Sequence, residues 1–124
     1  MHRLSKITVN FSPEPVLQAL LDTLPDDNCL QMLEFLDVSQ WGMEWFTEAF
    51  KFLDDLFASR PFPCLTKLLF HCCYRENGFK EDDFRFIQRY LGRAVERGVV
   101  YLRLHSTGEV FDSSYIREQV MAMA

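Results

Sequence analysis

The chain has 124 residues, of which 48% are hydrophobic and 25% are charged, and this composition is typical of a folded globular protein. Its net charge of -5 argues against a general nucleic-acid binder, which needs a basic footprint to release counterions from phosphates. No apolar run approaches the roughly 18 residues that cross a bilayer, and the start MHRLSKITVNF lacks the apolar core of a secretory signal. We therefore expect one intracellular, cytoplasmic domain over residues 1–124, without membrane insertion.

The four cysteines give no sign of a metal site or a disulfide framework. Cys29, Cys64, Cys72 and Cys73 contain no C-x-x-C pair and no second cluster. Because Cys72 and Cys73 are adjacent, they point to opposite faces of a strand. We expect reduced, mostly buried thiols, and no cofactor.

In chain order, the sequence predicts strands and helices in strict alternation. Strands are expected at residues 4–11, 33–39, 64–73 and 99–105. Helices are expected at residues 12–24, 43–59 and 81–97, and a last short helix begins at Asp112 or Ser113. Ser12 and the Glu81–Asp83 cluster suit helix starts, and Gly98 suits a left-handed position after a helix. The expected inward side chains of the helices are Val16, Leu17, Leu20, Leu21 and Leu24, then Phe46, Phe50, Leu53 and Phe57, then Phe84, Ile87, Leu91, Ala94 and Val95, then Ile116, Val120 and Met121.

One pattern, L-x-x-L-x-L, recurs with the strands. It is clearest at Leu65, Leu68 and Phe70, and it can be laid over Leu4, Ile7 and Val9, over Leu33, Leu36 and Val38, and over Val99, Leu102 and Leu104. The starting residues are spaced by 29, 32 and 34 residues, within the range that indicates a repeat architecture.

The faces of the strands decide between two architectures with this element order. A doubly wound sheet, covered on both sides, has nearly continuous apolar strands, whereas a solenoid has helices on one side only. Here Lys6, Thr8 and Asn10 alternate with apolar residues, and Tyr101, Arg103 and His105 do the same. One polar face favours the solenoid. The alternative is a small flavodoxin-like α/β domain that binds a small ligand at the carboxyl ends of its strands.

The units resemble leucine-rich repeats of the ribonuclease-inhibitor-like kind, whose pattern is L-x-x-L-x-L-x-x-N/C followed by a helix. The best match is Leu65, Leu68, Phe70 and Cys73, preceded by Pro63-Cys64. The other units depart from it with Ser12, Trp41 and Thr107 at the N/C position. The resemblance implies a right-handed βα solenoid, an arc with a parallel sheet on its concave face and helices on its convex face.

The resemblance also implies a non-enzymatic protein–protein interaction module that binds another protein on the concave face. Such arcs serve as substrate-recognition, assembly or scaffold subunits of complexes. The expected partner-binding residues are Lys6, Thr8, Phe35, Asp37, Lys67, Leu69, His71, Tyr101, Arg103 and His105. Among them, exposed Phe35, Leu69 and Tyr101 have the composition of interface hot spots. Alternatively, they are covered by loops or are scattered surface residues.

A second candidate surface is the helical stripe of Arg85, Arg89 and Arg93, with Phe86 beside it. It suits an acidic partner or phosphates, or it is simply a solvated helix face. The acidic residues Asp54, Asp55, Asp82 and Asp83 are expected to be surface charges.

The sharpest enzymatic candidate combines His71, Cys72, Cys73 and His105, which could supply a thiolate and a base or part of a metal site. No acidic residue is placed to orient either histidine, and no P-loop or G-x-G-x-x-G occurs. We therefore expect no catalytic residues. The first strand exposes a bare edge, so we expect another copy or a larger complex to cover it.

Overall fold

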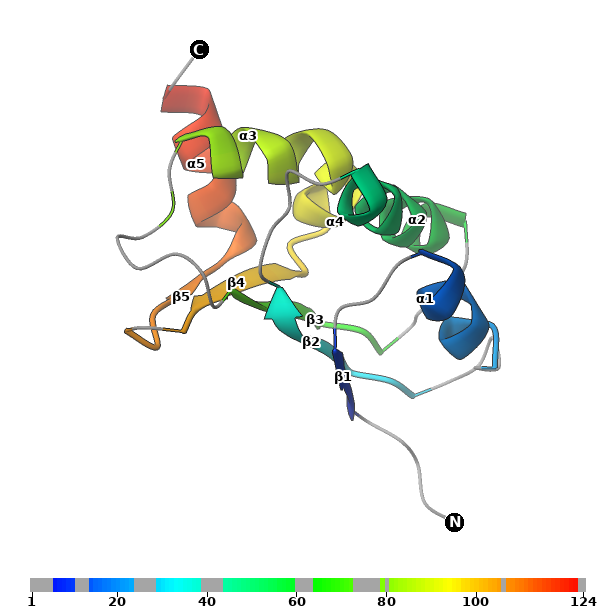
Figure 1. Ribbon diagram of the computed structural model, residues 1–124. Helices are drawn as coiled ribbons and strands as arrows, with labels where there is room; N and C mark the ends of the chain where they lie inside the picture. Colours follow the sequence, from blue (N-terminus) through cyan, green and yellow to red (C-terminus); the bar gives the residue numbers. More distant parts are fainter. Residues whose placement is uncertain are drawn as a thin grey trace.

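The computed structural model describes residues 6–10, 14–23, 29–38, 44–59, 64–72, 79, 81–105 and 107–122. Its strands and helices alternate along the chain except where α4 follows α3 and β5 follows β4 (Figure 1). In order they are β1 (Lys6–Asn10), α1 (Glu14–Leu21), β2 (Met32–Val38), α2 (Glu44–Ser59), β3 (Lys67–Cys72), α3 (Glu81–Tyr90), α4 (Gly92–Glu96), β4 (Val100–Leu104), β5 (Val110–Phe111) and α5 (Ser113–Ala122). They form an α/β fold with a five-stranded sheet of order β1-β2-β3-β4-β5, in which β1 to β4 are parallel and β5 is antiparallel.

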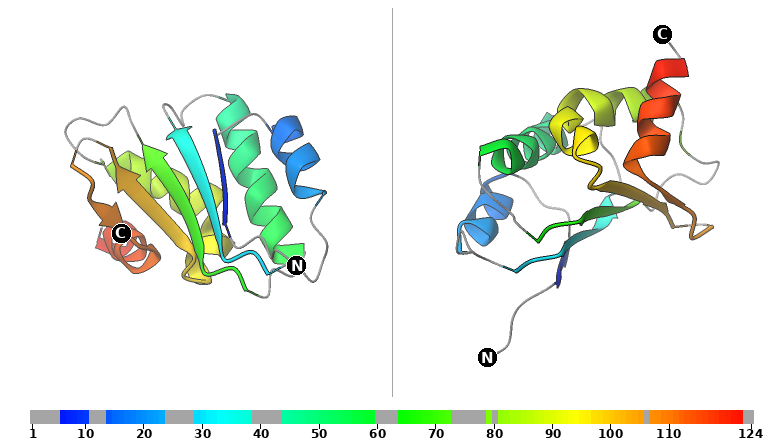
Figure 2. Two further views of the ribbon diagram at one scale, coloured as in Figure 1. Left: turned by 90° about the horizontal axis from the view of Figure 1, so that it is seen from below. Right: turned by 180° about the vertical axis from the view of Figure 1, so that it is seen from behind.

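The helices lie on one face of this sheet (Figure 1). Crossovers between parallel strands are right-handed. Because each successive parallel strand is added at the same edge of the sheet, every crossover helix lies on the same side. Figure 2 shows the opposite side, which no helix of the described residues covers. The flavodoxin-like alternative is wrong, because it requires β1 to lie between β2 and β3. The sheet is also not curled, so it has no concave face, and we call its helix-free side the open face.

The core lies between the sheet and the helices. Leu33, Phe35, Leu68 and Phe70 are buried, and the Phe35 and Phe70 rings stack with their centroids 5.2 Å apart. Phe50 of α2 lies on the same Phe70 ring, also at 5.2 Å, and thus joins the helix to the sheet.

The faces assigned to Phe35 and Leu36 of β2 from the sequence were wrong, whereas Val38 is buried as expected. Phe35 has 0% exposure and faces the helices, whereas Leu36 is only half-buried. The pairing with β3 shifts between Phe35 and Val38, and Val38 is buried as well. An irregularity of this kind adds a residue to one strand and breaks the strict alternation on which the assignment depended.

The first two helices bury one apolar stripe each. In α1 the buried residues are Leu17 and Leu21, four apart, whereas Val16 is 56% exposed and was wrongly expected to face inward. In α2, Phe50, Leu53 and Phe57 are buried as the helical spacing predicts, Ala49 is buried beside them, and the side chain of Phe46 lies outside the described residues.

The third predicted helix is divided in two at Leu91, which has φ -122° and ψ 26°. The short α4 begins without a side-chain cap of its own. Asp54 of α2 supplies one instead, because its Oδ1 accepts a hydrogen bond from the Ala94 backbone N–H at 3.1 Å. Gly98 follows with φ 76°, the left-handed conformation predicted for it.

The last helix begins as predicted, since Asp112 Oδ1 accepts a hydrogen bond from the Tyr115 N–H at 2.9 Å. The Ser113 hydroxyl bonds both backbone groups of Val100 and ties α5 to β4. Ile116 is buried, but Met121 is 72% exposed and was wrongly expected to face inward. The strand β5 was not predicted from the sequence.

Candidate functional site

The open face is built from alternate residues of four parallel strands. In the register of the sheet, Lys6 lies beside Met32 and Met32 beside Lys67. The next row consists of Thr8, Glu34, Leu69 and Tyr101. Asn10 lies beside Leu36, and His71 lies beside Arg103. This face carries most of the residues that the sequence assigned to a binding surface.

A polar cluster, which we call the Glu34 cluster, occupies the middle of this face. The carboxylate of Glu34 accepts hydrogen bonds from His71 Nε2 at 2.7 Å and Thr8 Oγ1 at 2.9 Å, and it pairs with Lys6 Nζ at 3.3 Å. Three adjacent strands therefore meet at one carboxylate. The side chains of Glu34 and His71 are only 13% and 15% exposed, although no helix of the described residues covers this face.

The environment of Glu34 holds it in the charged form. Burial acts to raise its pKa, but the hydrogen bonds from His71, Thr8 and Lys6 outweigh this effect and lower the pKa from 4.5 to about 2. Since a carboxylate only accepts hydrogen bonds, His71 Nε2 must carry a hydrogen toward it. With its oxygens already engaged, Glu34 is poorly suited to act as a general base and well suited to order the side chains around it.

Beside this cluster lies a mixed apolar and cationic area. Leu69 is on the open face but only 5% exposed, because it lies between Glu34 and Tyr101 in the sheet. Lys67 Nζ lies 4.8 Å from the centroid of the half-buried Tyr101 ring, within cation–π range. Arg103 is exposed next to His71, and no acidic side chain of the described residues pairs with it.

The sheet does not bring together all of the predicted binding residues. Phe35 lies in the core, and Leu69 is covered rather than exposed. His105 lies in the turn after β4, where its backbone N–H donates to the Cys72 carbonyl at 3.0 Å. The side chain of Asp37 lies outside the described residues.

Glu34, Met32 and Leu36 were missed, although the sequence contains a signal for them. In the sheet Leu33 pairs with Leu68 and Phe35 with Phe70, so the second unit of the L-x-x-L-x-L pattern begins at Leu30 rather than Leu33. Cys29-Leu30 then corresponds to Cys64-Leu65, and this shared pair could have set the alignment.

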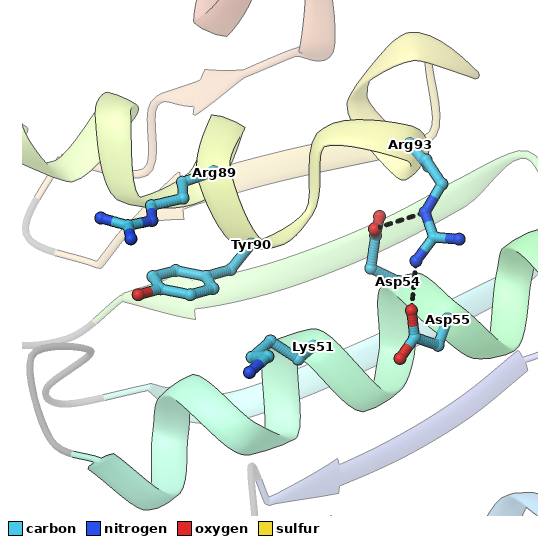
Figure 3. A pocket seen from close by; sticks show the side chains of 6 residues that line it. All are labelled: Lys51, Asp54, Asp55, Arg89, Tyr90 and Arg93. Carbon is cyan, nitrogen blue, oxygen red and sulfur yellow. Dashed lines mark hydrogen bonds and ion pairs between the residues drawn. The ribbon is translucent and has the colours of Figure 1, made fainter.

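On the opposite side, α2 and the α3–α4 segment carry the second candidate surface. Arg93 donates through Nε to Asp54 at 2.8 Å and through Nη2 to Asp55 (Figure 3). These bonds raise the pKa of Arg93, so it remains a cation. The sequence had suggested that Asp54 and Asp83 are surface charges, and this was wrong, because they are only 8% and 2% exposed.

The four residues predicted for this second surface differ in burial and in their contacts. Phe86 is half-buried against Phe50 and Tyr90, with ring centroids 5.6 Å and 4.8 Å away. Arg85 and Arg89 are exposed, and Arg89 lies 5.4 Å from the Tyr90 ring centroid. Only Arg89 and Arg93 line a hollow between the helices.

The expectation that no acidic residue orients either histidine was wrong, because Glu34 bonds His71 at 2.7 Å. The enzymatic candidate is nevertheless not assembled in the described part of the chain. His71 is on the open face, whereas Cys72 is buried on the helix side, with its thiol 3.7 Å from the Phe70 carbonyl oxygen. Cys73 lies outside the described residues. Among the residues that are described, no group of His, Cys, Asp or Glu could hold a metal ion.

Comparisons of the chain with protein-family models, with curated proteins and with solved structures found no match. Within the described ranges, no helix has the length and apolar character to cross a membrane.

Proposed function

We propose that this chain is a non-enzymatic protein-binding module of leucine-rich-repeat type that takes an acidic surface of its partner on the open face of the sheet. The observation that carries the proposal is the open face itself, on which ordered polar, aromatic and cationic side chains lie without a covering helix among the described residues.

The repeat-like part of the proposal is supported by where the pattern residues lie. In the third unit, Leu65, Leu68 and Phe70 are all buried. In the realigned second unit, Leu30, Leu33 and Phe35 are buried as well. Sequential parallel strands with helices on one side are the arrangement that such repeats require.

Two features depart from a regular arc of repeats. The sheet is not curled, and the antiparallel β5 ends the parallel series at β4. A short β5 is consistent with a cap on that end of the sheet, since it pairs with β4 and leads into α5.

The charge on the open face supports an acidic partner. Lys6, Lys67 and Arg103 are three cations on this face against one described carboxylate, Glu34, which pairs with Lys6 and leaves the face positive. The chain as a whole has a net charge of -5, so this face differs in sign from the molecule around it. Complementary charge of this kind speeds association and selects partners, while an aromatic such as Tyr101 supplies contact energy.

The prearranged Glu34 cluster supports binding rather than catalysis. Its side chains are held by one another, so a partner would meet a surface that has already lost much of its conformational freedom. A catalytic base would instead need an unengaged lone pair near a nucleophile, and Cys72 is on the other face of the strand.

The test is affinity capture with the wild-type chain and a Tyr101→Ala/Arg103→Ala variant, followed by binding measurements with the purified partner. Both side chains lie on the open face, so truncating them should leave the core intact. Loss of one hot spot weakens binding by about 2 kcal/mol, or roughly thirtyfold. The matched control is Arg117→Ala/Glu118→Ala on α5, which replaces exposed residues on the helix side.

Salt supplies the second readout, because screening weakens attraction between exposed charges. The proposal expects the captured protein to carry an acidic contact surface and its affinity to fall as salt rises. It would be abandoned if the open-face variant bound the purified partner as tightly as wild type while the α5 control lost binding.

A further inference from the structure

The hollow between α2 and the α3–α4 segment, on the side of the molecule away from the open face, gathers cations from all three helices. It has a volume of about 250 Å³ and is lined by Lys51, Asp54, Asp55, Arg89, Tyr90 and Arg93. In Figure 3, Arg93 and the two carboxylates lie at one end, Arg89 and Tyr90 lie toward the other, and Lys51 is between them on α2.

The two carboxylates do not make this hollow acidic. Arg93 bonds both of them, and Asp54 also accepts the Ala94 backbone N–H. Arg93 supplies one positive charge against these two carboxylates, so Lys51 and Arg89 bring the net charge of the lining to +1. In the described part of the chain Lys51 pairs with the exposed Glu48 at 3.7 Å, and such weak pairs exchange easily for a better anion.

The ring of Tyr90 gives the hollow an aromatic wall. Arg89 lies over this ring, 5.4 Å from its centroid, and Phe86 supports the ring from the core side at 4.8 Å. A ligand with a flat apolar part and an anionic end would match a wall and cations placed in this way.

We propose that this hollow binds the phosphate monoester of an aromatic group, with Lys51 and Arg89 on the phosphate and Tyr90 against the ring. A phosphate monoester offers several acceptor oxygens, so an ammonium and a guanidinium can bond it at the same time. The size of the hollow suits a single phenyl phosphate group, which is the end of a phosphotyrosine side chain or a small aryl phosphate. This site is independent of the open face.

The experiment titrates the full chain with phenyl phosphate in a phosphate-free, low-salt buffer and follows binding by calorimetry and backbone NMR. Inorganic phosphate, phenol, a tyrosine-phosphorylated peptide and its unphosphorylated form are titrated in parallel. The variants are Arg89→Gln and Lys51→Gln. Arg85→Gln is the matched control, because it is an exposed arginine one turn earlier on α3 and outside the hollow.

Phenyl phosphate should bind saturably, more tightly than inorganic phosphate, and should shift the NMR signals of α2 and α3. Arg89→Gln should weaken its binding roughly tenfold, the loss expected for one charge-assisted hydrogen bond, while Arg85→Gln changes nothing. Tighter binding of the phosphopeptide than of phenyl phosphate would identify a modified protein as the source, and binding of the small ester alone would identify a small molecule.

Three results would overturn the proposal. If phenyl phosphate does not bind saturably, the site does not exist. If Arg85→Gln and Arg89→Gln lose equal affinity for phenyl phosphate, the ligand is attracted to the whole helix and not to the hollow. Inorganic phosphate or phenol binding as tightly as phenyl phosphate would show that the aromatic wall and the cations do not act together. Circular dichroism of each variant verifies that the fold is intact.

Discussion

Phe35 and Tyr101 lie on opposite faces of the same sheet, so truncating each to alanine should have different consequences. Phe35 is fully buried and stacks on Phe70, and Phe35→Ala should lower the free energy of unfolding by about 3–5 kcal/mol. Tyr101 is half-buried on the open face, and Tyr101→Ala should cost about 1 kcal/mol. Urea unfolding of the two variants measures both changes.

The comparison also tests the face of β2 directly. If Phe35 lay on the open face, as the sequence had suggested, its truncation would cost no more than that of Tyr101. Equal losses in the two variants would therefore contradict the register between β2 and β3.

Glu34 should make stability depend on pH. Its pKa falls from 4.5 to about 2 on folding, so the folded state favours the carboxylate. The stabilisation is then fully present above pH 4.5 and is lost as the pH falls toward 2. Glu34→Gln should lower the free energy of unfolding at pH 7 by about 1–2 kcal/mol, because it removes charge-assisted hydrogen bonds. Urea unfolding between pH 7 and pH 2 measures the change.

The matched control is Glu109→Gln, which replaces an exposed glutamate in the turn before β5. Its effect should be small at every pH. The gap between wild type and Glu34→Gln should narrow as the pH falls through the acid range, and a gap that stays constant would mean that packing rather than charge accounts for it.

For single residues, the predicted side-chain direction was correct in strands whose polar and apolar residues alternate, and wrong in β2, where they do not. Lys6 and Thr8 are exposed and Tyr101 is on the open face, as the alternation predicts. In β2 both faces carry large apolar residues, so Phe35 and Leu36 could not be told apart by hydrophobicity. The irregular pairing after Phe35 removed the remaining cue.

At the scale of elements, the short helix α4 depends on a residue of another helix. Asp54 accepts the Ala94 N–H at 3.1 Å and the Arg93 Nε at 2.8 Å. Asp54→Ala should lower the free energy of unfolding by about 1–2 kcal/mol, as the loss of a helix cap does. Thermal unfolding measures the loss, and hydrogen exchange should accelerate at the Ala94 amide.

Asp55→Ala is the control, because Asp55 also pairs with Arg93 but is 74% exposed, whereas the hydrogen bond from the Ala94 amide goes to Asp54. Its effect should stay below about 0.5 kcal/mol, as is usual for exposed ion pairs. Comparable losses in both variants would show that the ion pairs with Arg93, and not the cap, hold α4 in place.

The division of α3 from α4 shows what element prediction lacked. The apolar spacing from Phe84 through Ile87 and Leu91 to Ala94 is continuous, and it predicted one helix. The break at Leu91 is accompanied by a tertiary contact from Asp54, which lies 40 residues from Ala94 in the sequence. The turn at Gly98, in contrast, follows from a local preference and was predicted correctly.

For the whole molecule, the edge of β1 is the feature to test. In the described residues β1 pairs with β2 alone, whereas β3 has a strand on each side. We expect a second copy of the chain or another protein to cover this edge. Hydrogen exchange of the isolated chain should be faster in β1 than in β3. At concentrations where sedimentation shows that the chain associates, exchange in β1 should become slower.

A chain that stays monomeric at high concentration, with β1 already as protected as β3, would contradict this expectation.

The order of strands and the side of the helices could be expected from the alternating elements and the right-handed crossover. The missing curl could not, because curvature depends on how helices and strands pack across the whole sheet.

Among the described residues, each strand pairs only with its neighbours along the chain, so the sheet can be shortened from one end without being cut in two. A fragment of residues 29–124 would lose the β1–β2 pairing and the packing of α1 on α2, and would keep the pairings of β2 with β3, β3 with β4 and β4 with β5. In a sheet of order 2-1-3-4, the same deletion would remove an interior strand. This topology therefore allows the open face to become narrower or wider by one strand at a time, and that is a simple route by which related chains could come to fit partners of different size.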